Sequence, residues 1–305
     1  MRPVSLLALL ALGLAPRASA LTFEQTIALP AIRLIPQLKL AAFTDRDEDS
    51  LIALLSDEDP AVRAQAARSL KAFALTGRRA EGALLNVVAD SWQPETVRRE
   101  AVKSLSWAAQ NANTRDRLVN LARDGSQTAS LRGIACKALY VSAGVDARTA
   151  QTLRDLLRDS SEQEPVRAGA AWALFADVAD RQTTDALRGA AADSSLSTPG
   201  SARFESVRSL YLAMGDRPVQ DAVKAIAADQ WSPLPLRVAA VLAHHAVNTE
   251  SGVHPWLLEV AQDQSQPALR AAALQALEDG ESLDFVRYFH LTHYRGQAVD
   301  PLTNE

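Results

Sequence analysis

Histidine is the residue type in this chain whose grouping most readily suggests chemistry. All five histidines follow residue 240, as His244, His245, His254, His290 and His293. His290 and His293 are three residues apart, so on a helix they would share a face and could bind a metal ion together. No acidic third ligand lies at a matching spacing. We therefore predict no metal site and keep His290 and His293 only as weak candidates.

Recognisable catalytic motifs are absent from the sequence. It contains no nucleophile elbow, no glycine-rich phosphate loop and no Cys/His zinc spacing. The single Cys136 cannot form an internal disulfide, and we expect it to pack as a small hydrophobic side chain. These observations predict a protein that is not an enzyme and needs no cofactor.

Arginine and aspartate recur along the chain at near-constant spacing, which indicates a structural role and not acid–base catalysis. The arginines define seven units, numbered 1 to 7 along the chain, at intervals of 35, 34, 35, 36, 34 and 33 residues. Mostly apolar or small side chains stand one residue before, three after and seven after each arginine, so they share one face of a helix. These unit arginines are Arg63, Arg98, Arg132, Arg167, Arg203, Arg237 and Arg270.

A second helix is expected before each arginine helix. Short amphipathic runs such as residues 51–55, 84–88 and 153–157 each lead to an aspartate, and a polar turn that usually contains proline follows. The sequence shows no strand pattern, so we predict an all-α fold with two helices in each unit. The unit aspartates are Asp57, Asp90, Asp124, Asp159, Asp193, Asp229 and Asp263.

The unit pattern resembles a known family. A helix that ends in Leu-Leu-x-Asp, a proline turn and then Val-Arg-x-x-Ala-x-x-x-Leu is similar to the HEAT repeat, particularly the short form of phycobilin lyases and many bacterial scaffold proteins. The resemblance covers roughly residues 48–280. Tetratricopeptide arrays have a similar period, but their Trp-x-x-Leu-Gly-x-x-Tyr signature is missing. The resemblance implies a right-handed α-solenoid of about seven two-helix HEAT-like repeats with N- and C-terminal capping helices.

The resemblance also implies a role for the unit aspartates and unit arginines, which form a ladder between neighbouring repeats in this family. A guanidinium can bind both a carboxylate and exposed helix-end carbonyls, so this role is physically reasonable. Units 5 and 6 depart from the pattern. Ala202 and Ser206 stand at core positions of unit 5, and His244 replaces the leucine of unit 6. We expect His244 to be a buried, hydrogen-bonded histidine.

The ends of the chain differ from the repeats. Arg2, an apolar run and Ala18-Ser19-Ala20 are typical of a secretory signal peptide cleaved after Ala20, and the run is too short to span a bilayer. We therefore expect a periplasmic or secreted protein. The expected layout is a signal peptide at 1–20, an N-terminal capping segment at 21–47, the solenoid at 48–282, a C-terminal capping helix at 283–295 and a flexible tail at 296–305.

The mature chain is expected to be acidic. The 305 residues include 32 Lys and Arg and 36 Asp and Glu, and loss of Arg2 and Arg17 with the signal peptide moves the net charge from −4 to −6. Proteins that bind nucleic acid usually carry a basic excess, so we do not expect that partner. No later segment is apolar enough to span a membrane.

A row of side chains one, five and eight residues after each unit arginine points away from the apolar face of that helix. It is basic in units 1 to 3 and largely aromatic in units 4 and 5, and stacked inner helices line the concave side of such a solenoid. The aromatic residues are either anchors for a partner or side chains buried between helices. We name the row the concave strip, and its candidate partner-binding residues are Arg68, Lys71, Arg99, Lys103, Lys137, Tyr140, Trp172, Phe175, Phe204, Arg208 and Tyr211.

Two classes of function follow from these observations. As a scaffold or adaptor in the cell envelope, the protein would hold an extended or acidic protein partner on the concave strip. As a lyase-like enzyme or a chaperone, it would handle a cofactor-bearing protein, as the resemblance to phycobilin lyases implies. The predicted export and the absence of a bilin-site motif favour the non-catalytic scaffold.

Overall fold

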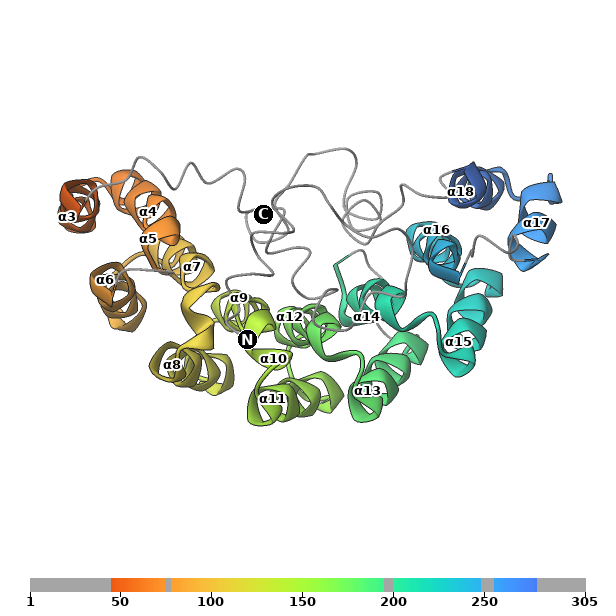
Figure 1. Ribbon diagram of the computed structural model, residues 1–305, viewed down its shortest axis with the longest axis horizontal. Helices are drawn as coiled ribbons and strands as arrows, with labels where there is room; N and C mark the ends of the chain where they lie inside the picture. Colours follow the sequence, from red (N-terminus) through yellow and green to blue (C-terminus); the bar gives the residue numbers. More distant parts are fainter. Residues whose placement is uncertain (1–44, 75–77, 195–199, 248–254, 279–305) are drawn as a thin grey trace, which may run out of the picture.

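The computed structural model describes residues 45–74, 78–194, 200–247 and 255–278. Within these residues all regular structure is helical, and the two-helix units follow one another along an arc (Figure 1). The outer helices lie on the convex side and are α3 (Asp45–Leu54), α6 (Arg78–Ala89), α8 (Ala112–Arg123), α11 (Ala147–Arg158), α13 (Arg181–Ala192), α15 (Arg217–Ala228) and α17 (Pro255–Gln262). The inner helices lie on the concave side and are α4 (Pro60–Ser69), α7 (Glu95–Ser104), α9 (Ala129–Ala138), α12 (Glu164–Ala173), α14 (Ala202–Leu210), α16 (Leu234–Ala243) and α18 (Pro267–Glu278).

Six of the inner helices are followed by a short helical turn that leads toward the next unit. These turns are α5 (Lys71–Ala74), η3 (Ala108–Gln110), α10 (Tyr140–Ala143), η4 (Leu174–Asp177), η5 (Tyr211–Ala213) and η6 (His244–Val247). The prediction of an all-α solenoid built from HEAT-like two-helix repeats is confirmed.

The hydrophobic core runs continuously between the inner and outer rows of helices. Each unit covers the apolar face of its neighbour, so the stack of units buries a surface that one unit alone could not bury. Five of the leucines seven residues after the unit arginines have no exposed surface, and Leu277 of unit 7 is partly buried; the five are Leu70, Leu105, Leu139, Leu174 and Leu210.

The inner helices of units 3 and 4 lie so close together that two positions between them have no room for a side chain. A Cβ atom on Gly133 of α9 would collide with the carbonyl group of Pro165, and one on Gly169 of α12 would collide with the carbonyl group of Gly133. The backbones of α9 and α12 therefore touch directly in the middle of the arc, which only glycine permits at these two positions.

Cys136 is a fully buried free thiol in α9. Burial raises the pKa of this thiol to about 12. In the described part of the chain, no helix has both the length and the apolar character needed to cross a membrane.

Several of the predicted end segments lie outside the described residues. These are the signal peptide at 1–20, most of the N-terminal capping segment at 21–47, the C-terminal capping helix at 283–295 and the tail at 296–305. The last three residues of the expected N-terminal capping segment belong to α3, which begins at Asp45.

Candidate functional site

The unit arginines join the end of each outer helix to the inner helix that follows it. In units 2 to 7 the Nε–H group donates to a carbonyl near the end of the outer helix, at N···O distances of 2.9 to 3.2 Å. In unit 1, Nη1 of Arg63 donates to the carbonyls of Asp57 at 2.7 Å and Glu58 at 3.1 Å. In units 2 to 7 the arginine thereby satisfies a carbonyl at the end of the outer helix, where the helix itself offers no partner.

The other end of the unit arginine reaches the turn of the next unit. At four junctions the acceptor is the side chain three residues after the unit aspartate: Gln127 for Arg98, Glu162 for Arg132, Ser232 for Arg203 and Gln266 for Arg237. A direct contact with the aspartate occurs only for Arg167 with Asp193, at 3.3 Å, and more loosely for Arg203 with Asp229, at 3.9 Å, among the described residues. The ladder implied by the family resemblance is therefore mostly indirect.

The unit aspartates hold the turn itself. Asp124 accepts hydrogen bonds from the backbone and hydroxyl of Ser126 at 3.0 and 2.7 Å. It also accepts one from Gln127 Nε2 at 3.0 Å, and so orients the amide whose oxygen binds Arg98. Hydrogen bonds from the serine hydroxyls, followed by other bonds within the turn, hold the pKa of four of these carboxyls below the ordinary value; they are Asp124, Asp159, Asp229 and Asp263.

The basic residues of the concave strip meet around Lys137 on α9. Burial lowers the pKa of this ammonium group, and the positive charges of Arg208, Lys103 and Arg99 lower it further, while Glu205 opposes the shift. The three cations belong to α14 and α7, so inner helices on both sides of α9 contribute. In the described residues, the Lys137 ammonium has no hydrogen-bond or ion-pair partner.

Two glutamates that the sequence analysis did not single out neutralise part of this charge. Glu100 accepts from Lys103 at 3.1 Å and from Arg68 at 3.0 Å, and Glu205 accepts from Arg208 at 2.8 Å. Burial would raise the pKa of Glu100, but the bonds from Arg68 and Lys103 outweigh burial and hold that pKa below its ordinary value. Each glutamate precedes its lysine or arginine by three residues, and this helical spacing is the signal that could have identified both.

Exposure differs strongly among the strip cations. The Arg68 side chain is 52% exposed, whereas that of Arg208 is 1% exposed. Lys103 is also buried, and Arg99 and Lys71 are partly buried. Lys71 places its ammonium group 5.1 Å from the ring centre of Trp107. A partner would therefore meet Arg68 before it meets the charges around Lys137.

The aromatic residues of the concave strip are buried. Tyr140, Trp172 and Phe175 form a cluster with ring centres 5.2 to 5.8 Å apart, and Phe204 lies 5.9 Å from the Arg208 guanidinium. These four side chains and Tyr211 are 3 to 6% exposed. Of the two interpretations left open by the sequence, the structure favours burial, because Tyr140 of α10, Trp172 of α12 and Phe175 of η4 pack against one another.

The histidines do not form a metal centre in the described part of the molecule. His244 is fully buried, with Nδ1 at 3.0 Å from the Ala240 carbonyl and its ring centre 4.2 Å from that of Trp256. His245 places Nδ1 at 2.8 Å from the Ala276 carbonyl. The described residues hold no group of three or more potential metal ligands. The weak candidates His290 and His293 lie outside these residues.

Comparison with protein families matches residues 48–140 to HEAT repeats. No curated protein matches the sequence of this chain. The matched residues form units 1 to 3, and units 4 to 7 continue the same arginine spacing in the same two-helix arrangement. Residues 48–140 are therefore similar to HEAT repeats, and the later units have the same two-helix arrangement.

Proposed function

We propose that this protein is a non-catalytic scaffold in the cell envelope that holds an acidic, extended segment of a protein partner on its concave side. HEAT repeats typically mediate protein interactions, and the match to them supports the scaffold class. The observation that carries the proposal is the charge around Lys137, where the positive charges of Arg208, Lys103 and Arg99 act on an ammonium group that has no ion-pair partner among the described residues.

A partner carboxylate would improve the environment of Lys137. An ammonium group that is desolvated without an ion pair is unfavourable, and a charge-assisted hydrogen bond would compensate for the lost water. The half-exposed Arg68 would extend the attraction into solvent and speed the encounter.

The envelope location is supported by the signal-peptide pattern that ends near Ala20. Protein recovered from the envelope should begin at Leu21 when its N-terminal peptide is identified by mass spectrometry. A chain that keeps Met1 in this fraction would contradict export by cleavage.

The scaffold proposal is tested with a strip variant, Lys71→Gln/Arg99→Gln/Lys137→Gln, and a matched variant of exposed arginines on outer helices, Arg117→Gln/Arg123→Gln/Arg148→Gln. Partners are recovered from the envelope with the unmodified protein and identified, and their binding kinetics are then measured at two salt concentrations. The strip variant should associate more slowly and depend less on salt, because screened charges act mainly on the encounter. Kinetics of the strip variant equal to those of the matched variant would refute the proposal.

Trp172 separates the two interpretations of the aromatic residues. Its side chain is 4% exposed within the Tyr140–Phe175 cluster, so Trp172→Ala should lower the free energy of unfolding by about 3 to 5 kcal/mol. Trp92, which is 93% exposed, provides the control, because Trp92→Ala should leave stability nearly unchanged. Urea unfolding and partner binding are measured in parallel. A stable Trp172→Ala protein that loses its partner would instead establish the anchor interpretation.

A further inference from the structure

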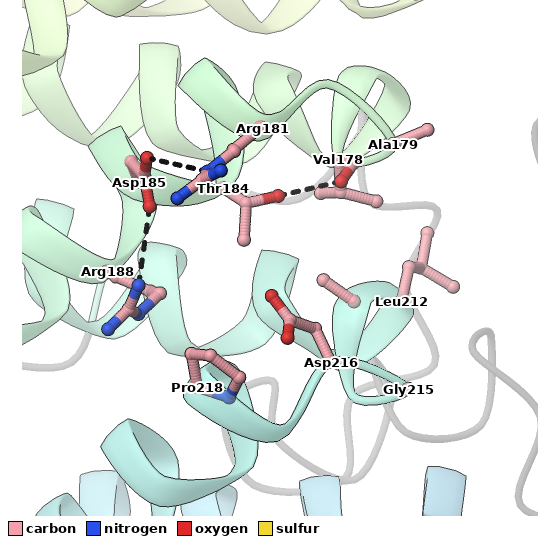
Figure 2. Close-up of a pocket in the computed structure, with 11 residues that line it drawn as sticks. Val178, Ala179, Arg181, Thr184, Asp185, Arg188, Leu212, Gly215, Asp216 and Pro218 are labelled. Atoms are coloured by element: carbon pink, nitrogen blue, oxygen red, sulfur yellow. Dashed lines mark hydrogen bonds and ion pairs between the residues drawn. The ribbon is translucent and has the colours of Figure 1, made fainter.

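A pocket of about 560 Å³ lies between units 5 and 6, beside the start of α13 and the start of α15 (Figure 2). Val178, Leu212 and Pro218 give it an apolar lining. Arg188 and Asp216 are among its charged residues, and Figure 2 shows the Asp216 carboxyl group within the hollow between the two helix starts. Neither the unit arginines nor the concave strip contributes a side chain to this pocket.

A guanidinium group occupies the equivalent place one junction earlier, between units 4 and 5. Arg154 is the eighth residue of α11, as Arg188 is the eighth residue of α13, and both helices have 12 residues. Nη1 of Arg154 donates to Asp177 at 3.1 Å and to Thr183 Oγ1 at 2.8 Å, and it lies 3.4 Å from Asp180. The Arg154 side chain is only 7% exposed, so this junction is closed by an internal ion pair.

The acceptors of Arg154 are only partly kept at the next junction. Asp180 and Asp216 are equivalent, since they are the N-caps of α13 and α15. Counted from these caps, Asp177 corresponds to Ala213 and Thr183 corresponds to Val219.

A hydrogen bond found in both units supports this equivalence. Thr184 Oγ1 donates to the Val178 carbonyl at 2.7 Å, and at the same two positions Gln220 Nε2 donates to the Met214 carbonyl at 2.8 Å. The junction between units 5 and 6 has therefore lost one carboxylate and one hydroxyl that could bind its arginine.

Arg188 consequently has fewer partners than Arg154. Among the described residues its Nη1 donates to Asp185 at 3.3 Å, whereas Nη1 of Arg154 has three acceptors. The buried Nε of both arginines has no hydrogen-bond partner. Asp185 is shared with Arg181, which lies 3.8 Å away and is 94% exposed. The side-chain carboxylate of Asp216 accepts no hydrogen bond from the start of α15. The pocket lining thus contains both Arg188 and Ala213, and Ala213 stands at the position where the preceding unit supplies a carboxylate to its own arginine.

We infer that this pocket binds the carboxylate of an aspartate or glutamate side chain from a protein partner, in the place that Asp177 takes beside Arg154. The charge balance supports an anion. The closed junction joins one arginine to two aspartates, whereas the lining of this pocket has two arginines, Arg181 and Arg188, and two aspartates, Asp185 and Asp216. One added carboxylate restores the closed junction's net charge and can form a bidentate, charge-assisted bond with Arg188.

The probe for this site is N-acetyl-glutamate N′-methylamide, with the neutral N-acetyl-glutamine N′-methylamide as its match. Both are titrated into the full chain labelled with ¹⁵N, and the Nε–H resonance of Arg188 and the amide resonance of Thr184 are followed. The glutamate probe should shift both resonances saturably, and the glutamine probe should bind at least tenfold more weakly, because it cannot form the charge-assisted bond.

Ala213→Asp is the sharpest variant, because it restores the missing carboxylate within the chain. It should weaken the glutamate probe at least tenfold and also raise the urea midpoint of unfolding, since Arg188 gains an internal partner. Arg188→Gln should abolish the shift of Thr184, whereas Arg148→Gln, which removes an exposed arginine of α11, should leave probe binding unchanged.

Three outcomes would overturn the inference. They are equal binding of the two probes, unchanged probe binding by Ala213→Asp, and succinate binding more than tenfold tighter than the glutamate probe, which would assign the pocket to a small molecule. The inference rests on the proposed function in taking its carboxylate from a protein, yet this titration can fail while the concave strip still binds its partner.

Discussion

The unit arginines and the strip cations differ in how far the chain itself satisfies their charge. Both rows follow the inner helices at the spacing of one unit. Arg132 donates to the Ala122 carbonyl and to both oxygens of Glu162, whereas Lys137, five residues later on the same helix, has no such partner among the described residues. A regular spacing therefore does not tell a structural cation from one available to a ligand. The two kinds of cation are distinguished by the number of acceptors already in contact with them.

The largest effect is expected from breaking a saturated unit arginine. Arg132→Met leaves Glu162 with an unpaired and largely buried carboxylate, so the free energy of unfolding should fall by about 3 to 5 kcal/mol. Arg270→Met is the control, since Arg270 is exposed and, among the described residues, donates to the Ala261 carbonyl without an ion pair. Urea unfolding of both variants measures the difference, and equal losses would show that burial of the ion pair does not matter.

A smaller effect is expected at Lys137. Lys137→Met removes a desolvated charge, so at neutral pH its free energy of unfolding should stay within about 1 kcal/mol of the unmodified protein. The pKa of Lys137 is lowered in the folded chain, so the unfolded chain holds this proton to higher pH and the stability of the unmodified protein rises as pH rises through the folded pKa. Any advantage of the variant should therefore shrink at alkaline pH. If the advantage of Lys137→Met in unfolding free energy instead grew above neutral pH, this would contradict the lowered pKa of Lys137.

The smallest effect concerns the turns. The lowered pKa values of Asp124, Asp159, Asp229 and Asp263 mean that the unfolded chain binds these protons more tightly. Their stabilisation is complete above the unfolded pKa of about 4 and is lost as pH falls through the folded values. The urea midpoint of unfolding falls as the pH is lowered, and in Asp124→Asn this fall should be slightly smaller than in the unmodified protein. Asp221→Asn, at an exposed site on α15, is the control, and matching declines in the two variants would exclude this role for the turn.

Much of the fold could be predicted from the sequence because one side-chain pattern recurs seven times. The spacing of Arg98 and Leu105 from their counterparts identifies the helix, its buried face and the next unit. The aspartate–arginine contact was harder to predict, since Asp124 is engaged by the backbone of its own turn and the acceptor, Gln127, lies three residues further on. Only the geometry of the turn shows which of these two side chains faces the neighbouring arginine.

The exposure of the aromatic side chains in the concave strip could not be predicted from the spacing. A helical spacing gives the direction of Trp172 from α12, but its exposure depends on how closely the preceding unit, with Tyr140 on α10, packs against it. Gly133 and Gly169 allow the backbones of α9 and α12 to touch. The pocket beside Arg188 was missed for a related reason, because it comes from the substitution of an acceptor in a neighbouring unit.

The rate at which the buried Cys136 is chemically modified can report how often the surrounding helices separate. A thiol with a pKa of about 12 and no exposed surface reacts with a thiol reagent only after the surrounding helices separate. Its modification rate, divided by that of an unfolded peptide, would measure the free energy of separating α9 from its neighbours. Because repeats hold only their neighbours, fraying that begins at either end must travel inward before this thiol reacts.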